Sequence, residues 1–571
     1  MLNSLKSIFT IVEVERKMLY RKAKFWVLGG IGLAGILFFM VVLTIISIVN
    51  SDIPGEFLLE GTDAYLALYF FSYAQAILII FVAGDFRKSE EKARLDQVML
   101  SKPMTVNWVL GKYLGVVGGI LYLNLFLLII AAIGRTLKVI FTGTGFNILP
   151  FLKYFGMVTM PSILFMTALV FFLVSLFRVQ SVAIIASLGY FVSILVYFHH
   201  KFLGLFDYGA FFAPIFSSDL IGFGNITPVL WQRLFFTLLG LALIGFSIVL
   251  YPRLWQSWLS KGLSIAFAGV FLFGAAIVAY MVVDKHQQTT ATRRTDLAFQ
   301  KNWTSRKTCQ IKHYDFDIKF GRVGTPLEVS VKMAVRNPLH EPLRNLFFAL
   351  NRDLAVSEVR WRNRTLTFKQ EHEMFSLDLG DQPLEPGSVD SIEISYSGSI
   401  DADAFMLDRL PESRGLIEKS DGPWTQGSIS AWISKEFAVL PAQCGWYPVA
   451  GAAAGYDFSS PRPQNFATAD IRVETSDDLT VISQGKQISE TVHEGRKVSR
   501  FTVNTAVPAL SLNIGTYKKL AHQFRQTDVQ IYVHPKHLLD YDLFSDVADT
   551  CYEVVDSILD VFEQVTGIPY P

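Results

Sequence analysis

The chain has 571 residues, of which 51% are hydrophobic and 18% are charged, and its mean hydropathy is +0.36. This composition is too apolar for an ordinary soluble protein, and the length exceeds that of one domain, so we expect a membrane part and a soluble part. The 51 Lys and Arg residues almost balance the 50 Asp and Glu residues, which argues against a nucleic-acid partner. Three cysteines without a C-x-x-C pair exclude a disulfide scaffold and a cysteine-rich zinc site.

Seven apolar runs follow an amphipathic arm at residues 1–24. They cover residues 25–49, 65–83, 113–133, 154–176, 182–198, 234–251 and 263–283, and each can cross the roughly 30 Å hydrocarbon core of a bilayer as a helix. The arm and the connection after the second run are rich in Lys and Arg, whereas the connection after the first run is acidic. Basic connections face the cytoplasm. We therefore expect the protein in a bacterial inner membrane, with the N-terminus on the cytoplasmic side and everything after Asp284 on the outer side.

None of the seven runs has an ionisable residue in its middle. An ion-coupled transporter needs such residues near the centre of the bilayer, so this class is disfavoured. If the helices transport a solute, the energy must come from outside the bilayer.

The connection from Ala83 to Gly115 contains a charged amphipathic segment, a Met-Leu-Ser-Lys-Pro turn that ends at Pro103, and a Gly-Lys pair before the third run. It resembles the coupling-helix loop of type-2 ABC exporter permeases, although Arg94 stands where that family often has Gly. The arm resembles the interfacial helix of the same family, with Leu5, Ile8, Phe9, Val12 and Leu19 near one face. The resemblance covers about residues 1–255. It implies a dimer of membrane domains and a separate ABC ATPase subunit, bound through Glu90, Arg94, Leu95, Val98, Met99, Leu100 and Pro103. The chain has no G-x-x-x-x-G-K-[ST] motif of its own for ATP.

A β domain follows the last apolar run. Residues 285–304 are polar and predict a linker, and residues 305–520 contain short runs of alternating hydrophobicity bounded by turn residues. Alternation with period two predicts an antiparallel sandwich, which the topology places outside the membrane.

Several blocks of this domain resemble the aminopeptidase N family of zinc metallopeptidases. They are Tyr396-Ser397-Gly398, Trp446-Tyr447-Pro448, Ser483-Gln484-Gly485 and the final turn with Gly567, Pro569 and Tyr570. The resemblance implies that residues 305–520 are that family's N-terminal β domain. Residues 521–571 would then hold its last strand and the first helix of a thermolysin-like catalytic domain. Two departures are the missing Asp-Glu-Pro after Pro448 and the long segment from Asp401 to Ser434.

The zinc helix of that family, H-E-x-x-H, does not occur in the chain, so the sequence provides no catalytic residue and no metal ligand. We therefore expect the chain to be a fragment, with zinc bound only if the catalytic domain follows in a longer protein. We also expect the terminal helix, at about residues 542–565, to be poorly packed. Its apolar stripe consists of Val554, Ile558, Leu559 and Phe562.

Three interpretations stay open. The first is an ABC exporter permease fused to an extracytoplasmic peptidase-like module. The second is a membrane-anchored metalloaminopeptidase whose helices serve only as an anchor. The third is a membrane protein whose β domain is a binding module without catalysis. The amphipathic connection favours the first, because a simple anchor does not need it.

Overall fold

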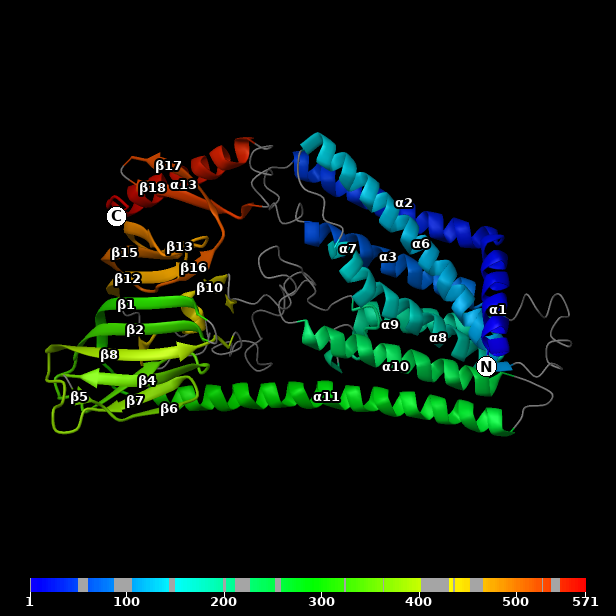
Figure 1. The fold of residues 1–571 in the computed structure, drawn as a ribbon, viewed down its shortest axis with the longest axis horizontal. Helices are drawn as coiled ribbons and strands as arrows, with labels where there is room; N and C mark the ends of the chain where they lie inside the picture. Colours follow the sequence, from blue (N-terminus) through cyan, green and yellow to red (C-terminus); the bar gives the residue numbers. More distant parts are fainter. Residues whose placement is uncertain are drawn as a thin grey trace. The chain divides into compact units, whose positions relative to one another are not determined.

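The computed structural model describes most of the chain. The described residues are 2–49, 60–86, 105–142, 149–198, 202–210, 226–251, 258–304, 306–322, 325–362, 364–401, 431–434, 437–451, 466–525, 527–535 and 545–570. The chain divides into two compact units, with the boundary between His286 and Gln287. We call them the helical unit and the sheet unit and describe each by itself (Figure 1).

The helical unit is built mainly from apolar helices. Its helices are α1 (Leu2–Tyr20), α2 (Ala23–Val49), α3 (Glu60–Ala83), α6 (Thr105–Thr142), α7 (Leu149–Tyr154), α8 (Met160–Phe177), α9 (Gln180–Ser193), α10 (Thr227–Leu250) and the first part of α11 (Trp258–Thr304), which continues past His286. A π-helical turn at Phe155–Thr159 joins α7 to α8, so that Phe151–Phe177 forms one apolar segment. A second π-helical turn, Ile194–Phe198, extends α9, and a short 3₁₀ turn follows at Phe202–Gly204.

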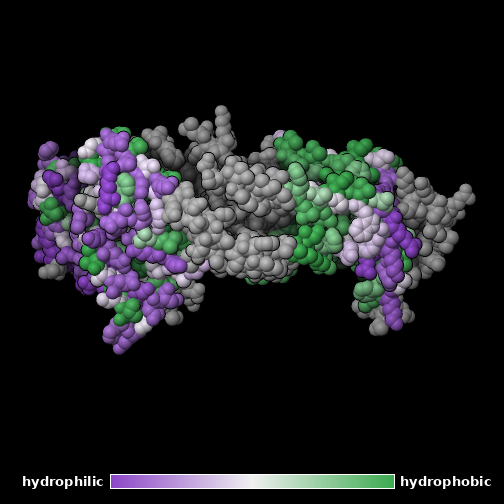
Figure 2. Space-filling view, turned by 90° about the horizontal axis from the view of Figure 1, so that it is seen from above, coloured by the Kyte–Doolittle hydropathy of each residue, from purple (hydrophilic) through white to green (hydrophobic). Residues whose placement is uncertain are grey.

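Five helical segments of the described residues are long and apolar enough to cross a membrane. They are Val106–Ile130, Phe151–Phe177, Gln180–Phe198, Thr227–Leu250 and Trp258–Thr292. The described parts of α2 and α3 contribute shorter apolar helices, Ala23–Gly35 and Phe71–Ala83. Figure 2 shows hydrophobic residues gathered over the visible face of the helical unit, whereas hydrophilic residues cover most of the sheet unit. Such a surface is compatible with lipid contact.

Helix α1 packs on α6 by one face. Leu5 and Phe9 are exposed, whereas Glu15 and Leu19 are buried against α6. The predicted contact of α1 with the membrane interface stays a prediction. The glycines of α6 determine which side chains of α1 can approach α6 closely.

The predicted linker at residues 285–304 is helical and continues α11 without a break. This stretch contains no Gly or Pro to end the helix. The hydroxyls of Thr292 and Thr295 donate hydrogen bonds to the carbonyl oxygens of Gln288 and Ala291, four residues earlier. The polar composition predicted a linker here, but it did not prevent a helix.

An eight-stranded sheet forms the centre of the sheet unit, in the order β14-β15-β12-β1-β2-β8-β4-β5. Its strands are β1 (Gln310–Arg322), β2 (Thr325–Arg336), β4 (Leu354–Trp361), β5 (Arg364–Thr365), β8 (Val389–Gly398), β12 (Ala467–Ser476), β14 (Lys486–His493) and β15 (Arg496–Val507). The prediction of an antiparallel arrangement is wrong at one pair, because β1 runs parallel to β12, with Phe316 opposite Ile471. Alternation identifies a strand but gives no information about the direction of a partner far along the chain.

Three smaller sheets complete the unit. One contains β13 (Thr480–Ser483), β16 (Leu512–Gly515), β10 (Ala438–Leu440) and β9 (Trp432–Ile433), and another contains β11 (Val449–Ala450), β3 (Asn345–Ala349), β7 (Met374–Asp378) and β6 (Phe368–Glu371). The third is a pair, β17 (Lys518–Phe524) and β18 (Thr527–Val533), followed by the helix α13 (Ser545–Thr566). Phe316 of β1, Phe348 of β3 and Leu512 of β16 belong to one buried cluster, so the eight-stranded sheet and both four-stranded sheets share a core.

Candidate functional site

The connection predicted to contact an ATPase lies outside the described residues. Residues 87–104 include every residue assigned to that contact, namely Glu90, Arg94, Leu95, Val98, Met99, Leu100 and Pro103. Both ends of the connection are described: a turn at residues 84–86 follows α3, and α6 begins at Thr105. The base of the connection is therefore the part of this site whose geometry is known.

Lys112 forms the centre of this base. Only 2% of its surface is exposed, and its Nζ donates a hydrogen bond to the carbonyl oxygen of Phe86 at 2.9 Å. The same Nζ lies 4.0 Å from Oε2 of Glu15, which is buried on α1, and 5.0 Å from the ring centroid of Trp108. A buried ammonium group needs such partners, because burial removes the water that would solvate its charge. Lys112 thus joins α1, the end of α3 and α6.

A column of glycines brings α1 close enough to α6 for this contact. Gly111, Gly115 and Gly119 recur every four residues and therefore lie on one face of α6. A Cβ atom added to any of them would collide with a side chain of α1. The colliding side chains are Ile11 at 2.6 Å from Gly111, Glu15 at 2.7 Å from Gly115, and Leu19 at Gly119.

Asp85 connects the base to two further helices. It forms an ion pair with Lys24 at the start of α2 and accepts a hydrogen bond from the amide of Gln180 at the start of α9. The ring of Phe86 stacks on Phe171 of α8, with centroids 4.2 Å apart. We call Glu15, Lys24, Asp85, Phe86, Lys112 and Gln180 the Lys112 cluster.

The sequence patterns did not identify the Lys112 cluster as a site. Lys112 directly precedes the run 113–133 and was counted as a basic residue of a connection. The signal that could have located it is the glycine repeat from Gly111 to Gly119, because such a repeat predicts a closely packed helix beside it.

A second buried polar cluster surrounds Arg233, near the start of α10. Its guanidinium donates hydrogen bonds to the carbonyl oxygens of Tyr208 at 2.5 Å and Asp207 at 3.0 Å. Gln232 also donates to Asp207 O, at 3.2 Å, and Ser162 of α8 donates to Tyr208 O at 3.0 Å. Arg233 lies one residue before the run 234–251, so the analysis of charges within the runs missed it. These contacts fasten residues 202–210 to α8 and α10.

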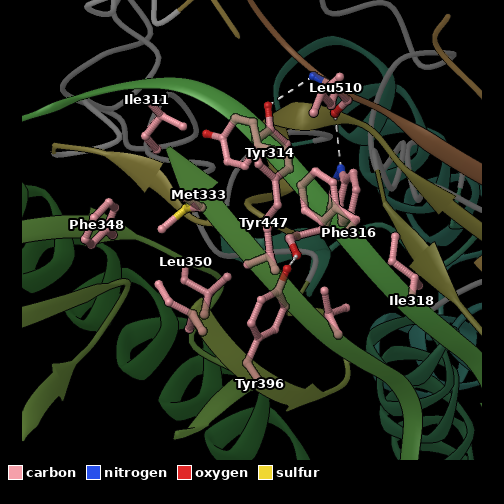
Figure 3. Packing of buried hydrophobic residues seen from close by; sticks show 14 of the residues in the cluster. Ile311, Tyr314, Phe316, Ile318, Met333, Phe348, Leu350, Tyr396, Tyr447 and Leu510 are labelled. Atoms are coloured by element: carbon pink, nitrogen blue, oxygen red, sulfur yellow. Dashed lines mark hydrogen bonds between the residues drawn. The ribbon is translucent and has the colours of Figure 1, made fainter. Parts of the chain in front are cut away.

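Two of the four blocks that resemble the aminopeptidase N family, those with Tyr396 and Tyr447, meet in the core of the sheet unit (Figure 3). Tyr396 donates a hydrogen bond to Trp446 O at 3.2 Å, and Trp446 Nε1 donates to Leu510 O at 3.2 Å. The amide of Leu510 in turn donates to the hydroxyl of Tyr447 at 3.0 Å, and Tyr314 donates to Pro448 O at 3.0 Å. These side chains are buried, and each hydroxyl or indole N–H in this set has a partner, as a stable core requires. Tyr396, Trp446 and Pro448 are thus packing residues that join three sheets.

Two glycines of these blocks occupy conformations that other residues rarely adopt. Gly398 has a φ of 147°, and a Cβ atom there would collide with the carbonyl oxygen of Asp353. Gly485 has a φ of 82°, and a Cβ atom would collide with the carbonyl oxygen of Thr502. Only glycine therefore fits at the end of β8 and in the bend between β13 and β14.

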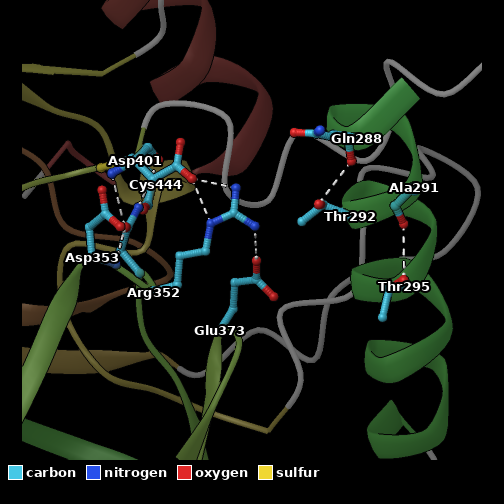
Figure 4. Close-up of polar contacts among 10 residues, drawn as sticks. Gln288, Ala291, Thr292, Thr295, Arg352, Asp353, Glu373, Asp401 and Cys444 are labelled. Atoms are coloured by element: carbon cyan, nitrogen blue, oxygen red, sulfur yellow. Dashed lines mark hydrogen bonds and ion pairs between the residues drawn. The ribbon is translucent and has the colours of Figure 1, made fainter. Parts of the chain in front are cut away.

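The start of the long segment from Asp401 is held by a polar network beside this core (Figure 4). The buried Asn351 donates to the carbonyl oxygens of Asp401 at 3.0 Å and Cys444 at 2.8 Å. Arg352 donates from Nε to the Asp401 carboxylate at 2.5 Å and from Nη1 to Glu373 at 3.3 Å. Burial, together with the Asp401 charge, raises the pKa of Asp353. Residues 402–430 lie outside the described part, so only the first residue of this segment can be placed in the network.

The terminal helix packs on β17 and β18 by one face only. His522 lies 3.1 Å from the carboxylate of Asp556, and Arg525 forms ion pairs with Asp560 and Glu563. Of the predicted stripe, Leu559 is buried, whereas Val554, Ile558 and Phe562 are exposed. The helix ends at Thr566, and Gly567, with a φ of 69°, begins the final turn. Pro569 and Tyr570 of this turn are exposed, and the amide of Tyr570 donates to Glu563 at 3.0 Å.

Within the described ranges, no group of three or more His, Cys, Asp or Glu residues is arranged to hold a metal ion. Burial raises the pKa of Cys309 and of Cys444 to about 12, so neither thiol is a ready nucleophile.

No protein-family model and no curated relative matches the chain. Among solved structures, an M1 zinc metallopeptidase from Deinococcus radiodurans is 20% identical, covers 39% of this chain and 47% of its own length, and has a TM-score of 0.30. Aminopeptidase A from Legionella pneumophila is 13% identical, covers 48% of this chain and 28% of its own, and has a TM-score of 0.35. The chain thus spans less than half the length of either protein. The proposals below rest on the residues of this chain.

Proposed function

We propose that the chain is a permease subunit of an ABC-type exporter, fused to an extracytoplasmic aminopeptidase N-like module. A separate ABC ATPase subunit binds the connection at residues 87–104, and two membrane domains form a dimer in a bacterial inner membrane. Zinc belongs to this proposal only for a longer protein that adds the H-E-x-x-H helix.

The Lys112 cluster is the observation that carries the permease part. An anchor requires only apolar helices, whereas this base holds the buried charges of Glu15 and Lys112, and the partly buried Asp85 paired with Lys24, at the two ends of one connection. Charged groups in such a location are costly and are typical of functional sites. This arrangement suits a connection that receives force from a partner.

The module part is supported by the packing of the aminopeptidase-like blocks. Tyr396 lies 50 residues before Trp446 in the sequence, but it donates a hydrogen bond to Trp446 O within one core, where Pro448 O also accepts one. A membrane-anchored metalloaminopeptidase is the second candidate. The exposed apolar face of α13 favours it, because Val554, Ile558 and Phe562 need a further packing partner.

The experiment that tests the permease part is co-purification of an ATPase in mild detergent. Substituting Leu95→Asp, Val98→Asp and Met99→Asp together should release the ATPase and leave membrane insertion intact, because three charges on an apolar contact face prevent docking. Quantitative mass spectrometry of the purified complex measures the ratio of the two proteins.

The matched control places three Asp residues on the sheet unit, as Val389→Asp, Ile488→Asp and Val492→Asp. These positions are also exposed and apolar, so the added charge is the same but the location differs. This variant should keep the ATPase. If the unmodified protein binds no nucleotide-binding subunit, the anchor interpretation is preferred.

A further inference from the structure

A pocket lies between the edge of the eight-stranded sheet and the β17–β18 pair. Its volume is about 450 Å³, within the range of about 300–1,000 Å³ that is typical of ligand pockets. Residues of β13 and β14 form one wall, and Tyr517, Lys519 and Tyr532 form the other. All of these residues belong to the sheet unit, so the pocket is built within one compact unit.

The open edge of β14 faces this pocket. The strand stands at the end of the sheet order, and within the described residues it pairs with β15 alone. Four consecutive residues of β14 line the pocket, namely Gln487, Ile488, Ser489 and Glu490. Because side chains alternate between the two faces of a strand, a run of consecutive residues places the pocket at the edge of β14 rather than over one face. The backbone N–H and C=O groups at such an edge can pair with a further extended chain.

The wall opposite β14 carries a cation. Lys519 lies opposite Tyr532 in the β17–β18 pair, so these two side chains share a face. His522, three residues after Lys519, contacts Asp556 of α13, so the other face of the pair is the one that α13 covers. Lys519 is exposed, and no carboxylate of the described residues forms an ion pair with it.

The acidic residue of the pocket already has partners. Glu490 accepts hydrogen bonds from Gln487 at 3.1 Å and from Ser499 at 3.4 Å, and its other carboxylate oxygen lies 3.9 Å from Nζ of Lys497. The charge of Glu490 is thus balanced within β14 and β15, whereas the charge of Lys519 is not. This asymmetry favours a ligand that carries a carboxylate.

Two tyrosines partly shield the pocket from water. The rings of Tyr517 and Tyr532 meet edge to face, with centroids 6.5 Å apart. Burial raises the pKa of Tyr517, and burial together with the Glu490 charge raises the pKa of Tyr532. An ion pair formed beside these rings is stronger than one in open water, because the local dielectric constant is lower.

We propose that this pocket binds an acidic peptide in an extended conformation, as an additional strand beside β14. The peptide backbone pairs with the open edge of β14, and an acidic side chain of the peptide pairs with Lys519. In this mode of recognition the main-chain hydrogen bonds provide affinity and the side-chain contact provides the preference. A sugar or a free carboxylate could contact Lys519, but neither would use the strand edge. The inference goes beyond the proposed function and depends on neither the ATPase nor zinc.

The test uses the full chain, purified in mild detergent, and the probe fluorescein-Gly-Thr-Val-Glu-Val-Thr-amide. Fluorescence anisotropy measures the dissociation constant of the probe. Replacing Glu of the probe by Gln should weaken binding about tenfold, because an interaction between two charged groups is lost.

Two further probes test the strand edge. Each carries N-methyl groups on one of the two alternate sets of residues in the same peptide. A strand bonds to its neighbour through every second residue, so one of these probes should lose binding and the other should keep it.

Lys519→Met and Lys518→Met form a matched pair of protein variants. Both lysines are exposed and adjacent on β17, but their side chains lie on opposite faces of the β17–β18 pair. Lys519→Met should weaken binding of the Glu probe about tenfold, whereas Lys518→Met should leave it unchanged. Lys519→Glu should reverse the preference, so that a probe with Lys in place of Glu binds more tightly than the original.

The outcomes separate the two parts of the inference. If the unmodified protein does not bind the Glu probe at millimolar concentration, the whole proposal is refuted. If the Glu and Gln probes bind equally, the role of Lys519 is refuted. If both N-methylated probes bind as tightly as the parent, or if free succinate displaces the Glu probe at equal concentration, the pocket is a site for small carboxylates and the added strand is refuted.

Discussion

Cys309 and Cys444 provide a test of burial at the scale of single residues. Both are buried in the sheet unit, and burial raises the pKa of each thiol to about 12. At pH 8 only about 10⁻⁴ of each is a thiolate, the form that reacts with maleimide. We therefore expect Cys551, which is partly exposed, to be modified first, as measured by peptide mass spectrometry.

The raised pKa values of these two thiols also predict how the free energy of unfolding changes with pH. In the unfolded chain a thiol ionises near pH 8.5, whereas in the folded chain it stays protonated up to about 12. The contribution of these thiols to folding is thus complete below pH 8.5 and is lost as the pH rises toward 12. Rapid modification of Cys309 at pH 8 without denaturant would contradict this prediction.

The sequence analysis singled out Gly398 and Gly485 through a family resemblance, and the structure shows why each position requires glycine. The sequence patterns did not identify Glu15, Lys112 or Arg233 as buried groups. Their burial depends on neighbours in other helices, such as Phe86 and Tyr208, that no local pattern reveals.

At the scale of elements, α13 offers two neighbouring positions with opposite exposure. Ile558 is 50% exposed and Leu559 is 8% exposed. Leu559→Glu should weaken the packing of α13 on β17 and β18 by about 1–3 kcal/mol, because it buries an unpaired charge. Ile558→Glu should have little effect. Hydrogen–deuterium exchange of the β18 amides in the full chain measures the difference.

Equal exchange in the two variants would show that α13 does not pack through Leu559. The sequence predicted this helix closely, at about residues 542–565 against Ser545–Thr566, because its period is local. It could not predict which of the apolar residues would be covered, since β17 and β18 provide the partner surface.

For the whole molecule, the predicted topology places residue 17 on the cytoplasmic side of the membrane and residue 494 on the outer side. We expect Glu494→Cys, in an exposed turn, to react with a membrane-impermeant reagent in intact cells. Lys17→Cys, on the exposed side of α1, should react only after permeabilisation. A background with Cys551→Ser removes the partly exposed native thiol. The reverse pattern would invert the assignment of the basic connections.

The sequence by itself determined the division into an apolar helical part and a β part. The first strand, β1, begins at Gln310, close to the start of the predicted β domain at residue 305. These features follow from hydrophobic periodicity and turn residues, which act over a few neighbouring positions. Only the tertiary structure decided the parallel pairing of β1 with β12, the face by which α1 packs on α6, and the burial of Lys112 beside Glu15. Each of these depends on a contact between segments distant in the chain. The free energy of such a contact comes from close packing and charge pairing in three dimensions, and no local pattern specifies it.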